Sequence, residues 1–557
     1  MFKKLSMVAL WSVVGLNCLG LQEVRGQWAT DPSNNLRLTP AAESHIYPQV
    51  VTDNQGGAYI AYAKYGHDLY MQRVNRFGYI EWDTSISEAP RTQRPEVIIP
   101  DKTGGAIVLW RDYSDHEGSI TFDYSSNALY AQRIDSAGHT IWAGNGVPVR
   151  AYMEPPYTPT LWEAMAPDGQ GGAFIAWYDW RSDSDYVYLQ HIDQTGNVLL
   201  QDDGLPTIPG PDPRIALVDD KNEGVYLIAH SRVSRYSAEG TAVWEAPVMA
   251  DSAGLSNRAV SDGAQGLIYA GLRLSAESYI GLQRLNLSGE KLWSDVRIPI
   301  KHDVHTPSFH LISDGHRGAY VSWETEANYQ FLDSTQHIDS TGTVLWSEPI
   351  EYFAHAPDCT GGFFGLKPSR ELGVDSVDNF YTQCVDPTGM LKWSQPGILT
   401  IARENWLRGF GRRQFVPTGD GGTLLFWDER EPVSNLFGIY GQQINHKGEL
   451  GHVITRINQQ KTSIPTGTVL YESYPNPFNS QTQIQYHLAS TQLVHLAIYN
   501  IRGELISVLV NQQQGPGDYR YQWSGSHNNG REVSTGIYLC RLVTKTQAIA
   551  TKIVLLR

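Results

Sequence analysis

Three short stretches of the sequence place a carboxylate one or two residues after a tryptophan, and these carboxylates are the first candidates for chemistry. The stretches are Trp110-Arg-Asp112, Trp177-Tyr-Asp179 and Trp427-Asp428. If they occupied equivalent places in a repeated fold, their aspartates would surround one rim as acids or ligands. A residue that recurs with a repeat usually serves the repeat, however. The structural interpretation is that each carboxylate holds a local turn, for example Asp179 with Arg181.

One loop concentrates three of the acidic side chains, Asp179, Asp183 and Asp185. Several carboxylate and carbonyl oxygens are what Ca²⁺ prefers, so these residues are weak candidates for a calcium site. Their spacing is not that of an EF-hand loop. A solvated acidic loop is the alternative interpretation, and no cofactor is implied.

Reactive motifs of the common enzyme classes are absent from the sequence. There is no Gly-x-Ser-x-Gly elbow and no His-Glu-x-x-His pair, so no catalytic residue is assigned. Cys359 and Cys384 fall in one repeat copy, where antiparallel pairing would bring them close enough for a disulfide. Whether this disulfide forms is left open. Cys540 lies in a strand of the tail, where we expect it to be buried and unpaired.

A fixed spacing recurs along most of the chain: a glutamine, a glycine six residues later and a tryptophan four residues after that. Five copies are complete, and three others substitute one position: Leu200 or His452 for the tryptophan, and Ser234 for the glutamine. The complete copies begin at Gln72, Gln132, Gln283, Gln336 and Gln383, and the substituted ones at Gln190, Ser234 and Gln442. We expect the glutamine amide to bond backbone groups, because buried polar groups need partners.

Each copy also contains a Gly-Gly segment followed by an apolar run, such as Gly104-Gly-Ala-Ile-Val-Leu-Trp110. A proline-led segment often comes before it, and an Asp/Asn-x-x-Gly turn follows the glutamine. Each copy therefore predicts four short strands, and no segment shows a helical apolar period. Repeated four-stranded units indicate an all-β fold, a β-propeller. Eight blades is the predicted number, with seven as the alternative.

Ring closure is predicted at the N-terminus. The eighth copy has His452 where the tryptophan belongs, whereas an extra tryptophan, Trp28, comes before the first proline-led strand. We predict that the segment around Trp28 completes the eighth blade.

The N-terminal residues have the pattern of a secretory signal peptide. Lys3 and Lys4 precede an apolar stretch that is too short for a confident membrane span, and small residues place the cleavage before Gln27. The expected organisation is a signal peptide at 1–26, a propeller at 27–456, a linker at 457–465 and a C-terminal domain at 466–557. No transmembrane helix is expected in the mature chain. The formal net charge of −15 argues against nucleic acid as a partner.

The C-terminal segment changes character and alternates in short strands, which predicts a small antiparallel β-sandwich. Its distinctive residues are Tyr474, Pro475, Asn476, Pro477, Phe478 and Asn479, followed by Gly503, Gly536, Tyr538 and Lys552. This tail resembles the C-terminal sorting domain of proteins exported by the bacterial type IX secretion system. The resemblance implies an immunoglobulin-like domain that is read by an outer-membrane translocon, after Sec export to the periplasm. It also implies that the protein is secreted or held on the outer cell surface.

Three functions remain open for the propeller. The first is a non-enzymatic protein that binds an extracellular glycan or protein through loops on one rim. The second is a hydrolase or lyase acting on polysaccharides, which predicts two carboxylates facing each other across a pocket. The third is a structural component of a surface layer. Propellers host unrelated functions, so the scaffold alone does not choose among them.

Overall fold

The computed structural model of the chain consists of strands, with no helix among the residues that it describes. It describes residues 28–451 and 469–555, apart from internal gaps at 65–67, 90–92, 114–127, 152–160, 182–183, 211–213, 230, 250–256, 274–277, 295, 301–308, 328–329, 359, 369–378, 403–412, 432–433, 471–472, 474–477, 479–480, 489, 501, 528–530 and 546–547. The chain divides into two compact units, Met1–Val453 and Ile454–Arg557. Within the described residues, no helix is long and apolar enough to cross a membrane.

The described strands of the first unit form eight antiparallel sheets. The first four sheets consist of β2 (His45–Thr52), β3 (Ala58–Lys64), β4 (Leu69–Val74) and β5 (Ile80–Ser87); β6 (Gln93–Pro100), β7 (Ala106–Asp112), β8 (Ala128–Ile134) and β9 (Val147–Arg150); β10 (Leu161–Pro167), β11 (Ala173–Arg181), β12 (Ser184–Ile192) and β13 (Leu205–Pro209); and β14 (Ile215–Asp219), β15 (Val225–Ala229), β16 (Arg232–Tyr236) and β17 (Val248–Met249).

The remaining four sheets follow the same order, except that the sixth sheet has three strands and the eighth takes its outer strand from the N-terminus. They consist of β18 (Asn257–Ser261), β19 (Leu267–Arg273), β20 (Tyr279–Leu285) and β21 (Val296–Pro299); β22 (Phe309–Ser313), β23 (Ala319–Ala327) and β24 (Gln330–Ile338); β25 (Phe353–Pro357), β26 (Phe363–Pro368), β27 (Phe380–Val385) and β28 (Ile398–Ile401); and β29 (Gln414–Pro417), β30 (Thr423–Arg430), β31 (Phe437–Ile444) and β1 (Leu36–Arg37).

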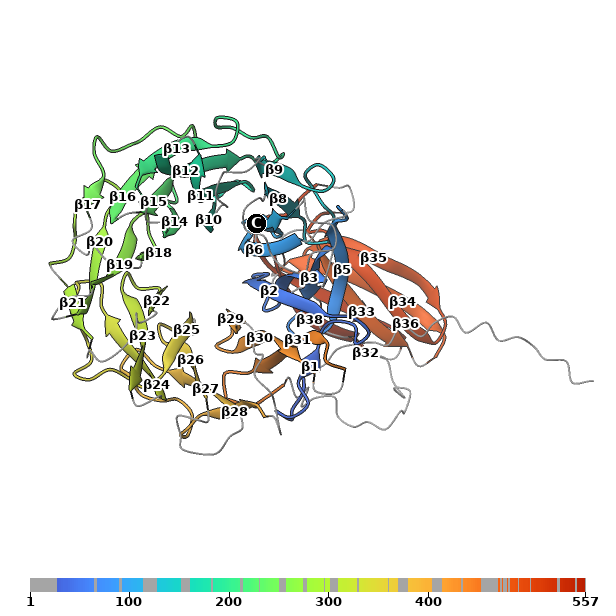
Figure 1. Cartoon of the computed structure of the whole chain (residues 1–557). Coiled ribbons are helices and arrows are strands. Elements are labelled where there is room, and N and C mark those ends of the chain that lie inside the picture. Colours follow the sequence, from blue (N-terminus) through green and yellow to red (C-terminus); the bar gives the residue numbers. More distant parts are fainter. Residues whose placement is uncertain are drawn as a thin grey trace, which may run out of the picture. The chain divides into compact units, whose positions relative to one another are not determined.

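The sheets stand around a common axis, with the first strand of each sheet innermost (Figure 1). Each innermost strand contacts the innermost strands of the two neighbouring sheets, and the last of them, β29, contacts β2. The ring is therefore closed, and the expected all-β propeller is confirmed. The second strand of a sheet is covered on both faces, as its apolar sequence predicts; every residue of β7 is buried.

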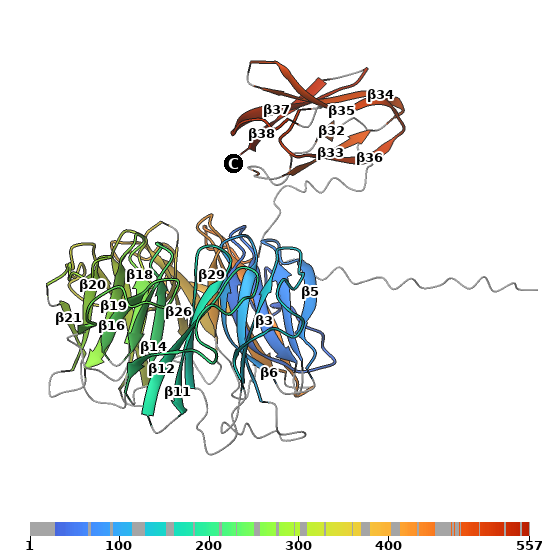
Figure 2. The same ribbon diagram turned by 90° about the horizontal axis from the view of Figure 1, so that it is seen from above.

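The two rims of the ring differ. Figure 2 shows the ring from the side, with the strands running between its rims. On one rim, five residues always join the first strand to the second, for example 53–57 between β2 and β3. On the other rim the connections vary widely, from two residues between β23 and β24 to fifteen between β7 and β8. One rim therefore carries repeated tight turns, and the other carries variable loops.

Packing between neighbouring sheets uses the repeated tryptophan and the repeated glycine. A Cβ atom added at Gly138 would lie 2.8 Å from the ring of Trp82 in the preceding sheet, and one at Gly196 would lie 2.9 Å from Trp142. The glycine also has positive φ, +90° at Gly138. The position must be glycine for both reasons, since an L side chain is strained there and would clash with the tryptophan.

The N-terminal segment completes the eighth sheet. Strand β1 pairs antiparallel with β31, with Leu36 opposite Gly441 and Arg37 opposite Tyr440. Trp28 is 3% exposed and packs edge-on against Phe426, with ring centroids 6.1 Å apart. The outer strand thus begins eight residues after Trp28, whose ring takes the place of the missing tryptophan.

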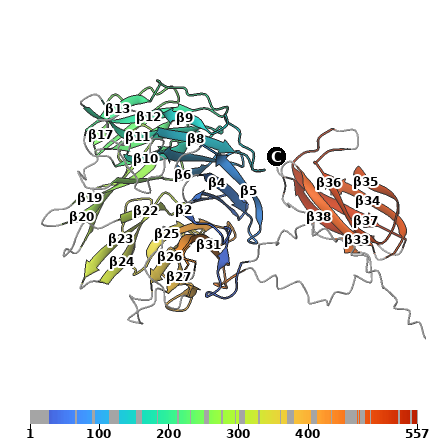
Figure 3. The ribbon, with the colours of Figure 1, turned by 45° about the vertical axis from the view of Figure 1, so that its right-hand side comes forward.

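The second unit is a two-sheet sandwich (Figure 3). One sheet contains β32 (Val469–Leu470), β33 (Thr482–Leu488) and β36 (Gly517–Trp523); the other contains β35 (Leu505–Gln514), β34 (Gln492–Asn500), β37 (Gly536–Val543) and β38 (Ala548–Leu555). A single apolar core joins the two sheets, including Ile484 and Tyr486 from the first and Leu496 and Leu542 from the second.

Candidate functional site

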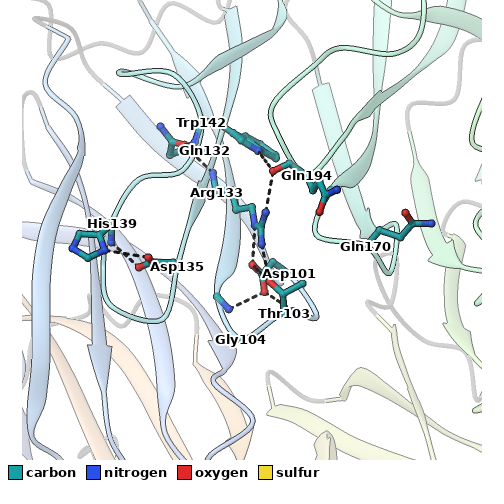
Figure 4. Close-up of polar contacts among 12 residues, drawn as sticks. Asp101, Thr103, Gly104, Gln132, Arg133, Asp135, His139, Trp142, Gln170 and Gln194 are labelled. Atoms are coloured by element: carbon teal, nitrogen blue, oxygen red, sulfur yellow. Dashed lines mark hydrogen bonds and ion pairs between the residues drawn. The ribbon is translucent and has the colours of Figure 1, made fainter. Parts of the chain in front are cut away.

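Charged side chains on the tight-turn rim hold neighbouring sheets together. Arg133 in β8 donates from Nε to Oδ2 of Asp101 (2.9 Å) in its own sheet and from Nη1 to the backbone oxygen of Gln194 (2.9 Å) in the next (Figure 4). Burial raises the pKa of Asp101, but hydrogen bonds from Thr103, Arg133 and Gly105 outweigh it and hold the pKa below its usual value. The carboxylate therefore stays ionised and serves the fold.

The same contact recurs around the ring, between the residue after the repeated glutamine and the first aspartate of the tight turn. Arginine or histidine supplies the donor in each of these pairs: Arg73 and Asp53, His191 and Asp168, Arg235 and Asp220, Arg284 and Asp262, and His337 and Asp314. These repeated carboxylates therefore have a structural role.

In five copies the repeated glutamine bonds the backbone with both ends of its amide or with its Nε2, as expected, whereas the buried side chain of Gln72 makes no such bond among the described residues. The Gln132 side chain donates from Nε2 to the carbonyl oxygen of Ala143 (3.0 Å), and its Oε1 accepts from the backbone N–H of Arg133 and Trp142. This amide ties the third strand to the segment that leads into the fourth. Gln190, Gln283, Gln336 and Gln383 make equivalent bonds.

Asp112, Asp179 and Asp428, the three aspartates that follow tryptophans, each accept a hydrogen bond from a residue of an innermost or outermost strand. Asp179 pairs with Arg150 of β9 in the preceding sheet (Nε to Oδ2, 2.9 Å), and both side chains are almost fully buried. Asp112 accepts from Nε2 of Gln93 (3.4 Å), and Asp428 accepts from the backbone N–H of Tyr47 (3.3 Å). The partner that the structure shows for Asp179 is Arg150, because β9 brings a guanidinium to the sheet boundary, and the side chain of Arg181 lies outside the described residues.

The calcium candidates are not assembled into a described site. Asp179 is bound to Arg150, Asp183 lies outside the described residues, and only the backbone of Asp185 is described, in β12. Among the described residues, no group of three His, Cys, Asp or Glu side chains could hold a metal ion.

The two cysteines that the structure describes form no disulfide. Cys384 is a free, buried thiol whose Sγ lies 3.5 Å from Oδ2 of Asp358, and Cys359 lies outside the described residues. Cys384 occupies the position at which other sheets place arginine or histidine against the turn aspartate. Cys540 is also free and buried, and burial raises the pKa of each thiol to about 12.

In the tail, the distinctive residues lie at structural positions. Phe478 is buried against Trp523 (ring centroids 5.5 Å apart), and its N–H donates to the carbonyl oxygen of Val554 (2.9 Å). Tyr538 donates from its hydroxyl to the oxygen of Ser534 (2.6 Å). Gly503 turns the chain with φ +80°, Gly536 begins β37, and Lys552 is an exposed residue of β38. Tyr474, Pro475, Asn476, Pro477 and Asn479 lie outside the described residues.

The sixth sheet differs from all the others because it has no outer strand in the described chain. In place of an outer strand, the described chain makes two isolated bridges to β24, Val344 with Ile338 at its end and Ile350 with Thr335, and then passes directly into β25. In the preceding sheet, by contrast, β21 pairs with β20 over four residue pairs. The segment Leu332–Ser334 of β24 therefore forms an open edge on the variable-loop side of the bridge between Thr335 and Ile350.

A cavity of about 570 Å³ lies at this open edge. Its lining comes from three consecutive sheets. It includes Arg297–Ile300 from β21 and beyond, Trp323 from β23, Asp333, Ser334 and Gln336 from β24, Val344 and Trp346–Pro349, Glu351, and Lys367 from β26. This volume is typical of ligand pockets, which combine apolar and aromatic walls with a few polar groups.

Asp333 breaks the repeat at this cavity. Six of the other seven copies place a buried apolar residue three positions before the repeated glutamine, and the fourth has Ser231. The six are Leu69, Leu129, Val187, Ile280, Phe380 and Ile439. Asp333 stands directly opposite Glu324 in the β23–β24 pair, so the two carboxyl groups share one face. Burial first, and the charge of Glu324 second, raise the pKa of Asp333 to about 7, while Lys367 and Arg413 act in the opposite direction.

This arrangement can bind or transfer a proton near neutral pH. A carboxyl group with a pKa near 7 can donate a hydrogen bond when protonated and attract a cation when ionised. A charged residue at a core position costs stability, and such departures from a repeat are expected where function requires them. The carboxylate in place of an aliphatic residue was visible in the aligned copies, but it was not singled out.

Comparison with known proteins identifies the tail. A β-propeller followed by a two-sheet sandwich is the class that the fold defines. Residues 472–556 match the family of secretion system C-terminal sorting domains. The chain thus carries a type IX sorting domain, and the protein is exported and then secreted or attached to the outer cell surface.

Solved structures similar to this chain share little sequence with it. The exotype rhamnogalacturonan lyase YesX is 11% identical, with a TM-score of 0.38 and 75% of each chain covered. The β-propeller domain of the trilobed protease from Pyrococcus furiosus is 10% identical, with a TM-score of 0.29; 61% of this chain and 89% of that one are covered. PorZ, a surface component of the type IX secretion system of Porphyromonas gingivalis, is 10% identical, with a TM-score of 0.15. The match covers 95% of this chain and 100% of PorZ. No curated protein matches the chain.

Proposed function

We propose that the propeller is a binding module presented outside the cell and that the cavity beside β24 is its ligand site. In this proposal, residues 1–26 direct Sec export, and the C-terminal domain then passes the protein to the type IX translocon. The ligand is an extracellular glycan or protein. The propeller supplies a rigid frame, and one departure from its repeat creates the site.

The sixth sheet carries this proposal. It lacks an outer strand in the described chain, it leaves a cavity of about 570 Å³, and it places Asp333 where six other sheets have a buried apolar side chain. A repeat that served only stability would keep an aliphatic residue at this position, because burial of a carboxyl group costs free energy.

A bulky side chain in the cavity tests the proposal. Val344 lines the cavity and is 39% exposed, so Val344→Trp should obstruct the site without disturbing the core. Val243, 45% exposed and not part of the cavity lining, gives the matched control Val243→Trp. On glycan and peptide arrays, the wild type and Val243→Trp should bind the same ligand, and Val344→Trp should lose it. Equal binding by all three proteins would refute the assignment of the site.

The pair of carboxyl groups favours a second candidate function, cleavage of a polysaccharide. A glycosidase needs one carboxylic acid with a raised pKa and one carboxylate, and Asp333 and Glu324 could take these roles. Release of reducing ends from a polysaccharide, abolished by Asp333→Asn but retained in Asp202→Asn at an exposed site, would establish this activity. Binding without turnover would favour the binding module.

A further inference from the structure

The open edge of β24 presents backbone hydrogen-bonding groups toward the cavity. Thr335 exchanges two hydrogen bonds with Ile350, since each N–H donates to the other carbonyl oxygen (2.8 and 2.9 Å). In an antiparallel sheet, alternate residues direct their N–H and C=O groups to the same side. Asp333 therefore directs its backbone groups toward the same outer edge as Thr335, where no described strand continues the pairing.

The neighbouring fifth sheet shows what fits at this edge. There, β21 covers the corresponding part of β20: Tyr279 faces Pro299, Ile280 faces Ile298, Gly281 faces Arg297 and Leu282 faces Val296. Ile280 corresponds to Asp333, because both stand three residues before the repeated glutamine. A strand of about four residues, or roughly 13 Å, would fill the same place in the sixth sheet.

Acidic groups around this place favour a cation in the missing strand. Asp333 and Glu324 share one face of the sheet, and Glu348 and Glu351 lie on the cavity wall. The cavity wall also contains two basic residues, Arg297 and Lys367, against the three acidic residues Asp333, Glu348 and Glu351. Lys367 lies 3.2 Å from a carboxylate oxygen of Glu351, so acidic side chains remain in excess. In the fifth sheet, the side chains of the paired residues Ile280 and Ile298 lie on the same face. A residue paired with Asp333 would likewise project from the face that carries Asp333 and Glu324. A lysine or arginine at this position would therefore meet the carboxyl groups of Asp333 and Glu324.

We infer that the cavity takes an extended peptide segment of a partner protein, which pairs antiparallel with β24 as its missing outer strand and places a lysine or arginine opposite Asp333. This inference rests on the proposed function and specifies its ligand as a protein. Affinity would come from main-chain hydrogen bonds, and preference would come from the side chain that faces Asp333, as in other cases of strand addition.

Synthetic peptides test the inference on the full mature chain. Three probes are octapeptides of alternating valine and threonine that differ only in one central residue, which is lysine, glutamate or norleucine. The fourth probe is the lysine peptide with alternate backbone nitrogens methylated. The lysine peptide should bind at least tenfold more tightly than the glutamate peptide. Methylation on the edge-facing side should remove binding, since it removes the donors to β24. Asp333→Asn should reduce the preference for lysine over norleucine.

The outcomes separate this inference from the proposed function. Equal binding of the methylated and unmethylated lysine peptides would overturn strand addition. If only glycans bound, and Val344→Trp abolished that binding, the cavity would be the ligand site but the peptide inference would be wrong. If Val344→Trp left every ligand bound, the proposed function itself would fail.

Discussion

The indole Nε1 of Trp28 donates a 2.9 Å hydrogen bond to the backbone oxygen of Arg76, across the junction between the eighth and first sheets. Trp82 makes the same bond to Ser136 (3.0 Å), and Trp142 makes it to Gln194 (3.2 Å), each in the following sheet. Trp28 therefore belongs to the tryptophan series, although it is separated from the eighth copy by almost the whole propeller sequence. The first and last parts of the propeller form one structural unit.

Replacement of Trp28 by alanine should destabilise the propeller. The variant loses a buried ring and the bond to Arg76, so the free energy of unfolding should fall by about 3–5 kcal/mol. Chemical denaturation followed by fluorescence would measure it. Trp162, 53% exposed in β10, is the matched control, and Trp162→Ala should change stability by less than about 1 kcal/mol. Similar losses in both variants would contradict the closure role of Trp28.

Replacement of Gly138 by alanine should also be destabilising, because Gly138 has φ +90° and an added Cβ would lie 2.8 Å from Trp82. A strained backbone alone costs about 1 kcal/mol or more, and the contact with the indole adds to it. Gly144 provides the comparison, since a Cβ there would meet nothing within 4 Å. Gly144→Ala should be nearly neutral in the same denaturation experiment, so equal effects would show that neither the positive φ of Gly138 nor its contact with Trp82 matters for stability.

Much of this architecture could be predicted from the sequence because the repeat fixes local contacts. The Gln–Gly–Trp spacing marks the third strand and the turn that follows it, and the structure places the glutamine and the glycine there. The tryptophan, expected at the end of the fourth strand, instead lies near the start of that strand or precedes it, as Trp142 precedes β9. Closure was predicted near Trp28, but β1 begins at Leu36. Its two residues carry no strand pattern of their own, and their position depends on pairing with the distant β31.

The candidate site was harder to predict because it depends on an absent strand. The sixth copy keeps Gln336, Gly342 and Trp346, so its sequence indicated an ordinary blade. Only the short path from Ile350 to β25 and the acidic Asp333 distinguish it, and burial decides what that carboxyl group does. The partner of Asp179 was also missed, since Arg150 reaches it from another sheet.

The contact between Arg133 and Asp101 predicts sensitivity to acid. The pKa of Asp101 is lowered in the folded protein, so its contribution to stability is present above its unfolded value of about 3.9 and is lost as the pH falls through the folded value. At pH 7, the free energy of unfolding of Asp101→Asn should be about 1–3 kcal/mol lower than that of the wild type. Below pH 4 this difference should shrink, because the wild type loses the contribution of the ionised Asp101. Denaturation at pH 7 and pH 3 would measure this. Asp202→Asn, at an exposed site, should follow the wild type at both pH values.

Phe478 should control the stability of the sorting domain. Phe478→Ala removes a buried ring from the contact with Trp523, and the free energy of unfolding of the second unit should fall by about 3–5 kcal/mol. The same variant should accumulate in the periplasm if the translocon reads the folded domain, as fractionation would show. Leu493→Ala, at a 60% exposed position of the same domain, should be exported normally. Normal export of Phe478→Ala despite an unfolded tail would show that the translocon reads sequence alone.

Asp333 should make the propeller less stable as the pH rises. Its pKa is about 7 in the folded protein and about 3.9 when unfolded, so between these values the folded state holds a proton that the unfolded state has lost. Stability should therefore fall toward pH 7, by at most about 1.4 kcal/mol per pH unit. Asp333→Asn should not show this decline, and its stability relative to the wild type should increase from pH 5 to pH 8. Glu324→Gln should lower the midpoint of Asp333, measured by its carboxyl infrared band, because a neighbouring negative charge is removed. An unchanged midpoint in Glu324→Gln, together with a pH-independent difference for Asp333→Asn, would show that the two carboxyl groups do not interact.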